Sequence, residues 1–378
     1  MKEGWEYKKL GEVCEILDSQ RKPITKGKRE PGAIPYYGAT GCLDYVKDYI
    51  FDEKLVLLGE DGAKWGAGDN SAYIINGKSW VNNHAHALRP KRDLLIDELL
   101  VYYLNFSNLL PYITGVTVPK LNQEKMRSIE IPIGPLKEQQ SIVDYLDSAF
   151  AKIDAMKANA EKALNETNAL FQASLKEMLE PKEGWEEKKL GEICSDIRYG
   201  TSTPSHENGE YKYLRMNNIT NDGFLDVSHY KTISLPPKEL EKCLVKKGDI
   251  IFNRTNSREL VGKSCVFTED ENMVIAGYLI RIRLKDGFEP QFITYSMNLQ
   301  RSLGLFQHLI VGAVHQANIS ANNIQKVIIN YPLLSEQQSI VETLDSLKSK
   351  VDRLQANYDK ISQECDALKQ AILRQVFE

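Results

Sequence analysis

The sequence predicts an α+β protein in which two mixed α/β domains are separated by two long helices, the whole forming an internal repeat with pseudo-two-fold symmetry. Three observations predict this fold class. The chain has 378 residues, which exceeds what one ordinary core organises. Its opening and closing segments each occur twice. Two long segments carry apolar residues at the spacing of a coiled coil.

The repeat is visible in two pairs of segments. Residues 3–13, EGWEYKKLGEV, return at 183–193 as EGWEEKKLGEI, and residues 138–148, EQQSIVDYLDS, return at 336–346 as EQQSIVETLDS. The interiors between these segments barely resemble each other. Duplication followed by drift would blur all parts comparably. Matching frames around dissimilar centres therefore favour one scaffold that presents two different binding surfaces.

The closing segment of each repeat is predicted to be a long helix. Apolar residues step by alternating threes and fours through 340–372, and a similar seam runs through 142–163. Such a seam requires a partner helix, so the two helices are predicted to pack antiparallel on each other. About forty residues make a helix of roughly 60 Å. The predicted helix-pairing residues are Ile153, Met156, Leu344, Leu347, Val351, Leu354, Ile361 and Leu368.

These signals divide the chain into four parts. The first domain is expected at 1–136, the first spacer helix at 137–180, the second domain at 181–334 and the second spacer helix at 335–378. Pro181 and Gly184 end the first helix. Buried strands are expected at 54–58 and 249–252, an alternating strand at 278–284, and short helices around 94–106 and 290–303.

The composition is that of a folded cytoplasmic protein. Hydrophobic residues make up 42% and charged residues 26% of the chain, which is ordinary for a globular protein. The sequence contains neither an apolar run that could span a membrane nor a secretory signal. The six cysteines form no CxxC pair, so reduced thiols are expected. A net charge of −4 means that any binding to DNA must use local patches or a partner's charge.

The doubled frame resembles the specificity subunit of type I restriction-modification systems. The first hinge reads IPIGPLKEQ at 131–139 and continues with Ile142, Val143, Leu146 and Asp147. The second, INYPLLSEQ at 329–337, has an asparagine where the first has its first proline. The resemblance covers essentially the whole chain. It implies two target-recognition domains that read a bipartite DNA sequence, one half-site each, across a gap set by the helices.

The resemblance also implies partners. They are double-stranded DNA, two adenine-methyltransferase subunits and, in the restricting form, restriction/translocase subunits. No cofactor, catalytic residue or metal is expected in this chain. Its only Pro-Pro pair, at 236–237, follows Leu235, where a methyltransferase needs Asn or Asp. His84 and His86 share a strand face, but the sequence shows no third ligand nearby.

Candidate DNA-reading residues are those with Arg, Lys, Asn, Gln or His side chains in polar clusters. In the first domain the clusters predict Arg21, Lys22, Lys28, Asn82, Asn83, His84, His86 and Lys120. In the second domain they predict Lys212, Arg215, Asn217, Asn218, Asn253, Arg254, Asn256, Ser257, Arg258, Lys263, His315 and Gln316. The cluster at 253–263 ranks first because it follows a buried strand that can aim a loop.

Two other functions remain open at this stage. One is a coiled-coil scaffold whose two domains bind proteins or glycans. The other is the specificity subunit of a related system that cleaves on both sides of its site. A self-sufficient DNA-modifying enzyme is disfavoured by the missing motifs.

Overall fold

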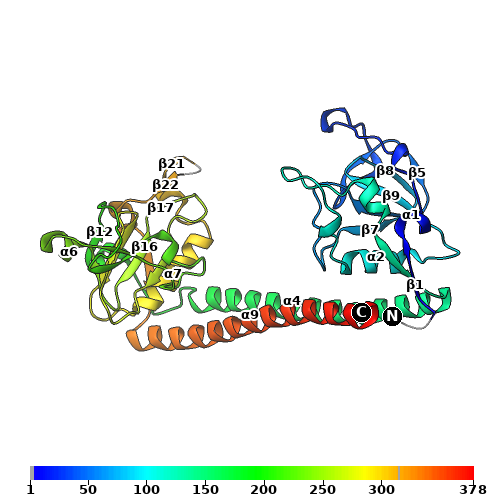
Figure 1. Cartoon of the computed structure of the whole chain (residues 1–378). Coiled ribbons are helices and arrows are strands. Elements are labelled where there is room, and N and C mark those ends of the chain that lie inside the picture. The colour runs from blue at the N-terminus through cyan, green and yellow to red at the C-terminus, as the bar shows by residue number, and fades with distance from the viewer. Residues whose placement is uncertain (1–3, 314–315) are drawn as a thin grey trace. The chain divides into compact units, whose positions relative to one another are not determined.

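The computed structural model describes residues 4–313 and 316–378. By their contacts these residues form two compact units. Unit 1 comprises Met1–Lys162 and Asn357–Glu378, and unit 2 comprises Ala163–Ala356. The two longest helices, α4 (Leu136–Met178) and α9 (Leu334–Phe377), each contribute residues to both units. Figure 1 labels strands and helices of both units.

The described part of unit 1 contains two four-stranded sheets and a two-stranded ribbon. The sheets have the orders β2-β9-β6-β7 and β4-β3-β8-β5, and the ribbon pairs β1 with β10. All pairs are antiparallel except β3 with β8. The strands are β1 (Glu6–Lys9), β2 (Cys14–Ile16), β3 (Pro31–Gly38), β4 (Gly41–Val46), β5 (Phe51–Asp52), β6 (Leu55–Gly59), β7 (Ala72–Ile75), β8 (Lys78–Val81), β9 (Ala85–Pro90) and β10 (Glu130–Ile133).

Strand β6 shows how the core of unit 1 is organised. Val56 and Leu58 lie in one buried cluster, while Leu55 and Leu57 lie in another. Since successive side chains of a strand point to opposite faces, both faces of this sheet are covered. Helix α2 packs beside β7 (Figure 1). The helices are α1 (Leu10–Val13), α2 (Asp97–Phe106) and α3 (Gln123–Arg127), with 3-10 turns η1 (Asp18–Gln20), η2 (Lys26–Lys28) and η3 (Leu110–Tyr112).

Unit 2 repeats this topology. Its sheets have the orders β12-β20-β16-β18 and β14-β13-β19-β15, with β13 and β19 parallel, and β11 pairs with β23. It adds the three-stranded sheet β17-β22-β21. The strands are β11 (Glu186–Lys189), β12 (Cys194–Tyr199), β13 (Tyr211–Leu214), β14 (Lys231–Ile233), β15 (Leu244–Val245), β16 (Ile250–Asn253), β17 (Thr255–Asn256), β18 (Ser264–Val266), β19 (Met273–Ile275), β20 (Leu279–Leu284), β21 (Val311–Ala313), β22 (Gln316–Asn318) and β23 (Ile328–Tyr331).

The helices of unit 2 also correspond to those of unit 1. They are α5 (Leu190–Ile193), α6 (Pro237–Cys243), α7 (Pro290–Ser302) and α8 (Ala321–Ile324), with 3-10 turns η4 (Met216–Asn218) and η5 (Gln307–Leu309). Helices α5, α7 and α8 occupy the positions of α1, α2 and α3 along the repeat, and α6 is an addition. The strands expected at 54–58 and 249–252 and both short helices are therefore confirmed.

The repeated EQ pair of each hinge has the same task in both units. In unit 1 the buried Gln139 accepts a hydrogen bond from Ile96 N (3.0 Å) and donates to Leu94 O and Gly134 O. In unit 2 the buried Gln337 accepts from Glu289 N (2.9 Å) and donates to Pro332 O. Their neighbours Glu138 and Glu336 accept from the indole N–H groups of the repeated tryptophans, Trp5 and Trp185. The repeated residues thus fix each sheet domain to the start of its helix.

Within unit 1 the beginning of α4 and the end of α9 run antiparallel. Lys369 Nζ lies 2.5 Å from Asp154 Oδ1, and Lys157 Nζ lies 3.2 Å from Asp366 Oδ1. The residue numbers therefore increase in opposite directions along the two helices, as predicted. Next to these pairs the buried Cys365 thiol faces the carbonyl of Ile153.

The predicted pairing residues fare unequally. Ile153, Leu344 and Val351 are buried, and Leu347 and Ile361 are half-buried. Met156, Leu354 and Leu368 are exposed, with 59%, 37% and 48% of their surface accessible, so their prediction as pairing residues is wrong. In α9 the buried residues Leu344, Val351 and Cys365 repeat at intervals of seven and fourteen residues, whereas the exposed Leu354 and Leu368 belong to the second apolar position of the pattern, which the partner helix covers less. Leu164, Cys365 and Leu373 are buried in the helices.

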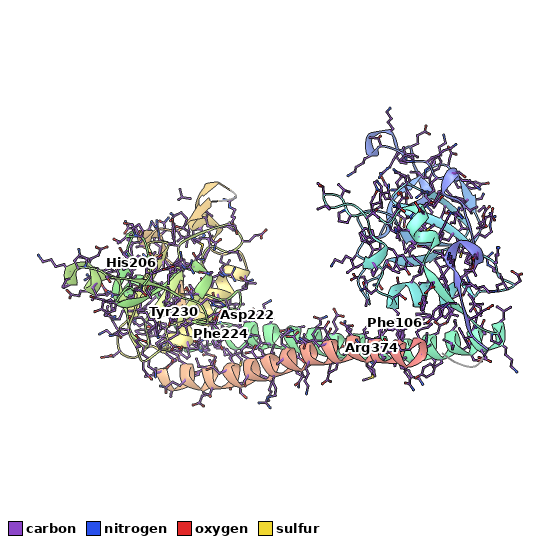
Figure 2. The ribbon with its side chains drawn as sticks, viewed as in Figure 1. Phe106, His206, Asp222, Phe224, Tyr230 and Arg374 are labelled. Atoms are coloured by element: carbon purple, nitrogen blue, oxygen red, sulfur yellow. The ribbon has the colours of Figure 1, made fainter. Side chains whose placement is uncertain are left out.

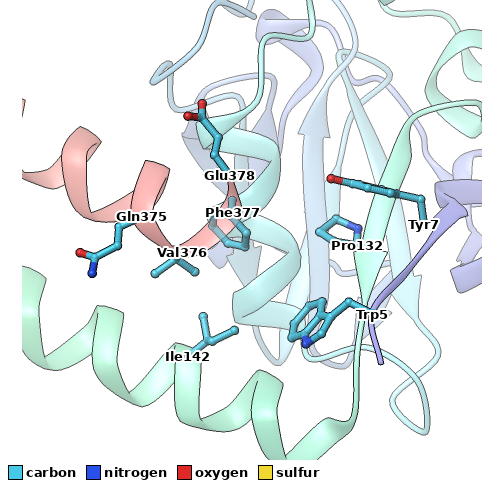
Figure 3. A pocket seen from close by; sticks show the side chains of 8 residues that line it. All are labelled: Trp5, Tyr7, Pro132, Ile142, Gln375, Val376, Phe377 and Glu378. Carbon is cyan, nitrogen blue, oxygen red and sulfur yellow. The ribbon is translucent and has the colours of Figure 1, made fainter. Parts of the chain in front are cut away.

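Aromatic packing holds the end of α9 in unit 1. The Phe377 ring centroid lies 5.4 Å from that of Tyr103 and 5.6 Å from that of Phe106. Beside it lies a cavity of about 270 Å³ (Figure 3), lined by Trp5, Tyr7, Pro132, Ile142, Gln375, Val376, Phe377 and Glu378. In unit 2, Lys348 of α9 pairs with Asp222 and lies over the Phe224 ring; both of these partners are labelled in Figure 2.

Among the described residues no helix combines the length and the apolar composition needed to cross a membrane.

Candidate nucleic-acid interface

A groove in unit 2 brings two predicted clusters together. Its volume is about 950 Å³. Arg215 and Asn217 come to it from the segment after β13, and Arg254 and Thr255 come from the segment after β16. The groove is lined by Thr201, Ser202, Thr203, Pro204, Ser205, Tyr213, Arg215, Met216, Asn217, Lys231, Arg254, Thr255, Ala276, Gly277, Tyr278 and Asn318.

A buried amide shapes the first wall of this groove. Asn218 accepts a hydrogen bond from Arg215 N at 2.8 Å and donates to the carbonyls of Asp226 (2.8 Å) and His229 (2.7 Å). These bonds close the turn at η4 and leave Asn217 exposed. Asn218 is itself 3% exposed, so it positions the reading loop instead of contacting DNA. This corrects its assignment as a reading residue.

Arg254 forms the second wall and is held from three directions. Its guanidinium donates to Gly277 O (3.1 Å) and to Asn318 Oδ1 (3.0 Å), and it lies over the Tyr199 ring at 4.8 Å from the centroid. Ile319 N donates to the Arg254 carbonyl, and β22 pairs with β17 directly after Arg254. The side chain therefore ties the β21-β22 hairpin to the sheet. Arg254 is thus a positioning residue, and because it also lines the groove, its contact with DNA stays a prediction.

The groove wall retains polar atoms that no described residue satisfies. They are Nε of Arg215, Nε of Arg254 and Oγ1 of Thr255. These atoms are buried beneath the groove surface, so the polar groups that the groove offers are those of its exposed side chains, such as Asn217. Lys231 adds an exposed cation at the rim. The groove can thus accept an anionic backbone or the polar edge of a base.

The other candidates of unit 2 lie apart from the groove lining. Asn253 and Lys263 are buried, and Lys263 donates to Ile219 O at 2.7 Å. Burial lowers the pKa of Lys263. Both residues are structural, so they too leave the set of DNA-reading residues. Asn256 accepts from Ser257 N, and Arg258 is exposed.

Three further candidates complete unit 2. Lys212 pairs with Glu271 at 2.6 Å, and that hydrogen bond raises the pKa of Lys212. Gln316 lies on β22 next to the groove residue Asn318. His315 lies outside the described residues.

A buried ion-pair network organises the candidates of unit 1. Glu60 receives Arg21 Nη1 at 2.6 Å and Lys120 Nζ at 2.7 Å. His86 Nδ1 lies 2.7 Å from Asp18 Oδ2, and its Nε2 lies 2.7 Å from Leu121 O. Burial acts to raise the pKa of Asp18, but the hydrogen bond from His86 and the charge of Arg21 outweigh it and lower that pKa. The network joins η1, the end of β6, β9 and the segment before α3.

Three predicted reading residues of unit 1 lie largely out of reach of solvent, and two of them, His86 and Arg21, belong to this network. His86 is fully buried with both ring nitrogens occupied, and Asn82 is 2% exposed with its oxygen accepting from His84 N. The Arg21 side chain is 10% exposed and also donates to Ala85 O. The structure thus corrects the prediction for all three side chains, which hold loops in place and offer few polar atoms to DNA.

Three residues of the same network are of the types that can ligate a metal ion. Asp18, Glu60 and His86 present ligand atoms within 4.8 Å of one another. However, Arg21 and Lys120 already lie against Glu60. The Arg21 guanidinium and the Lys120 ammonium group, both at hydrogen-bond distance, would repel a further positive charge. The chemistry of the set therefore fits an ion-pair network better than a metal centre.

The remaining candidates of unit 1 lie on the surface. Lys22, Lys28, Asn83 and His84 are exposed, and His84 Nδ1 pairs with Asp61. Lys120 is partly exposed, and its hydrogen bond with Glu60 raises its pKa. No pattern in the sequence selects Glu60 or Asp18, because their role arises only when distant strands meet.

The six cysteines are unpaired, and five of them are buried while Cys42 is exposed. Burial raises the pKa of the Cys14 and Cys194 thiols to about 12. A thiol with so high a pKa is a poor nucleophile and a poor metal ligand at neutral pH.

The fold and the paired surfaces define a two-domain binding protein with a duplicated frame, and comparison with known proteins identifies its family. Residues 2–166 and 182–363 each match the family described as "Type I restriction modification DNA specificity domain". The chain belongs to this family.

Two curated relatives span most of the chain. A putative type I restriction enzyme specificity subunit of Haemophilus influenzae is 26% identical over 91% of this chain and 88% of its own length. The EcoKI specificity subunit of Escherichia coli is 24% identical over 87% of this chain and 75% of its own length.

Two solved structures share the fold. A chain from a study titled "Structural basis underlying complex assembly and conformational transition of the type I R-M system" aligns with a TM-score of 0.75 at 20% identity, covering 100% of this chain and 98% of that chain. The HsdS subunit from Thermoanaerobacter tengcongensis aligns with a TM-score of 0.57 at 20% identity, covering 100% and 97%.

Proposed function

We propose that this chain is the sequence-reading, non-catalytic specificity subunit of a type I restriction-modification enzyme. Each unit reads one half-site of a bipartite target in double-stranded DNA. The chain assembles in the cytoplasm with two adenine-methyltransferase subunits and with restriction/translocase subunits. It contributes sequence recognition, while the partners contribute the chemistry. The observation that carries the proposal is that the DNA specificity domain matches twice, once over most of each half of the chain.

The two unequal surfaces support one half-site per unit. In unit 2 the groove presents Arg215, Asn217 and Lys231. In unit 1 the corresponding loops are braced by the Glu60 network and present exposed Lys22 and His84. Since the scaffold topology is the same in both units, a difference in loop chemistry alone can give two different half-sites. A scaffold that binds proteins or glycans is not favoured, because it leaves the doubled DNA specificity match unexplained.

The two helices are proposed to set the gap between the half-sites. Each is continuous over more than forty residues, 43 in α4 and 44 in α9. Helices of that length span roughly 60 Å. The proposed domain limits are those expected from the sequence, 1–136, 137–180, 181–334 and 335–378. Apolar side chains that are exposed on these helices, such as Met156 on α4 and Leu368 on α9, remain available to partner subunits.

The test is binding of the complex purified with its methyltransferase partner to a duplex that carries the target. Asn217→Ala and Arg215→Ala are expected to weaken cognate binding, by roughly 1–3 kcal/mol if the changed residue contacts a base edge. Lys247→Ala is the matched control, because Lys247 is an exposed cation of unit 2 outside the groove. If the groove variants bind like the control while remaining folded, the groove does not read the second half-site.

A further inference from the structure

A loop of unit 1 presents apolar side chains to solvent at a place where the chain is otherwise polar. It runs from Thr114 to Lys120 with the sequence TGVTVPK. Val116 is fully exposed and Val118 is 67% exposed. Single exposed valines are common on protein surfaces. Val116 and Val118 differ from such single residues because both occupy the tip of one short, closed loop.

The loop is closed tightly at its base. Thr114 N donates to Lys120 O at 2.9 Å, and Lys120 N donates back to Thr114 O at 2.8 Å. The Thr114 hydroxyl also donates to Lys120 O. Gly115 has a φ of +88°, and a Cβ there would lie 2.4 Å from Val118 O, so only glycine fits this turn. The tip itself consists of β-branched residues and Pro119, which restrict rotation.

The base of the loop is anchored in the buried network. Leu121 N donates to Glu60 O at 2.8 Å, and the carbonyl of Leu121 lies 2.7 Å from His86 Nε2. Lys120 Nζ pairs with the Glu60 carboxylate. The ion pairs that occupy His86 and Glu60 therefore hold the loop from within the domain. A rigid apolar tip loses little conformational entropy when it binds, which favours a binding role.

The corresponding segment of unit 2 borders the candidate DNA surface. In both units a 3-10 turn precedes the segment, and a helix with a side-chain cap, Asn122 or Ser320, follows it. In unit 2 the segment forms the β21-β22 hairpin (Figure 1). Its Val311 is 67% exposed and its Asn318 lines the groove beside Arg254. The same place in the repeat thus carries an exposed valine in both units, at the loop tip in unit 1 and at the start of β21 in unit 2.

We propose that the Thr114–Lys120 loop inserts into a groove of the DNA duplex, and that Val116 and Val118 read part of the first half-site by apolar contact with base edges. The thymine C5-methyl group in the major groove is the partner that valine methyl groups fit. Glu60 and His86 act as positioning residues for this loop. The inference rests on the proposed function, since it assumes that unit 1 reads DNA.

The experiment measures the affinity of the complex, purified with its methyltransferase partner, for its bipartite duplex and for an unrelated duplex. The double variant Val116→Thr with Val118→Thr keeps the side-chain shape and replaces one methyl group of each valine by a hydroxyl. We expect it to lower the cognate affinity roughly tenfold, since about two methyl groups lose their apolar contact. Affinity for the unrelated duplex should not change, because non-specific binding depends on phosphate contacts.

Two comparisons separate a reading role from a structural one. The double variant Val116→Ile with Val118→Ile keeps the apolar tip and should retain roughly half or more of the cognate affinity. Replacing thymine by uracil in the first half-site should reduce wild-type affinity but leave the threonine variant unaffected. The unfolding temperature should stay the same in both variants, because the tip is exposed.

The outcomes distinguish the two levels of the account. If the wild-type complex prefers the bipartite duplex but the threonine variant binds it equally well, the loop inference is overturned and the proposed function stands. If the wild-type complex shows no preference for any bipartite duplex, the proposed function fails and the inference fails with it.

Discussion

The Glu60 network gives a prediction with a defined magnitude. Glu60→Gln keeps the size of the side chain but removes its charge. The Glu60 side chain is 11% exposed and that of Arg21 is 10% exposed, so their 2.6 Å ion pair is shielded from water. Removing one partner of a buried pair commonly destabilises by about 3–5 kcal/mol. Arg21 keeps its hydrogen bonds to Ala85 O and Asp18 O, so we expect about 2–3 kcal/mol.

The assay is thermal unfolding of the purified chain followed by circular dichroism. For a unit of this size a loss of about 2–3 kcal/mol lowers the unfolding temperature by roughly 5–10 °C. Hydrogen exchange should also accelerate at Leu121 N, which donates to the Glu60 carbonyl. The matched control is Glu30→Gln, because Glu30 pairs with Lys47 on the open surface, where both side chains are mostly exposed. An exposed pair contributes little, so the control should unfold like the wild type.

Equal unfolding temperatures for Glu60→Gln and Glu30→Gln would refute this reasoning. The network would then be an arrangement of charges without a net effect on stability. Its proposed role in bracing the Thr114–Lys120 loop would lose its energetic basis as well.

Three further predictions follow from the acid network, the groove and the helices. Burial acts to raise the pKa of Asp18, but His86 and Arg21 outweigh it and lower that pKa below its usual 3.8. Asp18 therefore stabilises the fold above about pH 4 and loses this contribution as the pH falls through the lowered pKa. The difference in unfolding temperature between wild type and Asp18→Asn should shrink below pH 4, and a constant difference would contradict the assignment. Arg254→Lys keeps the charge but loses the two-pronged donor geometry, so hydrogen exchange in β22 should accelerate, whereas Arg258→Ala, at an exposed side chain, should leave it unchanged; equal exchange in both would remove the positioning role. Matched seven-residue insertions near Ala160 and Gln355 should widen the gap between unchanged half-sites by roughly three base pairs, since they add about 10.5 Å of helix and DNA rises about 3.4 Å per base pair; methylation at the original spacing by a folded variant would show that the helices do not set the gap.

The frame of the fold could be predicted from sequence because it is repeated and periodic. The doubled EQ hinge predicted two equivalent junctions, and Gln139 and Gln337 make equivalent hydrogen bonds there. The helices were predicted from their seam, but the pairing residues were only partly right. A seven-residue pattern indicates that a helix has a partner, but it does not say how deeply each of its two apolar positions is covered. Leu344, Val351 and Cys365 at one position are buried, whereas Leu354 and Leu368 at the other are exposed.

The site was less predictable because residue type does not indicate direction. Lys263 and His86 belong to polar clusters in the sequence, yet both are buried. Buried polar side chains are retained because they hydrogen-bond backbone groups that hold loops, and such partners are distant in sequence. The alternating strand shows the same limit, since Arg281 lies on the face opposite Ile280 but is also buried, paired with Asp196.

The exposed valines at 116 and 118 were missed for a different reason. The search for base-reading residues selected amide and basic side chains, which carry hydrogen-bond information. An apolar reading contact has no such signature in the sequence. A signal was available in the combination of a glycine, three β-branched residues and a proline within one short segment, which is typical of a stiff turn.

The central claim is that this chain chooses the DNA sequence that its partners modify. The most direct measurement is genome-wide mapping of methylated adenines in the host, with the chain present and with its gene removed. We expect methylation at one bipartite motif, two short half-sites with a fixed gap, that disappears when the chain is absent and returns when it is restored. Restoration with Asn217→Ala and Arg215→Ala together should weaken or alter methylation through the second half-site alone. A methylation pattern that is the same with and without the chain would contradict the account.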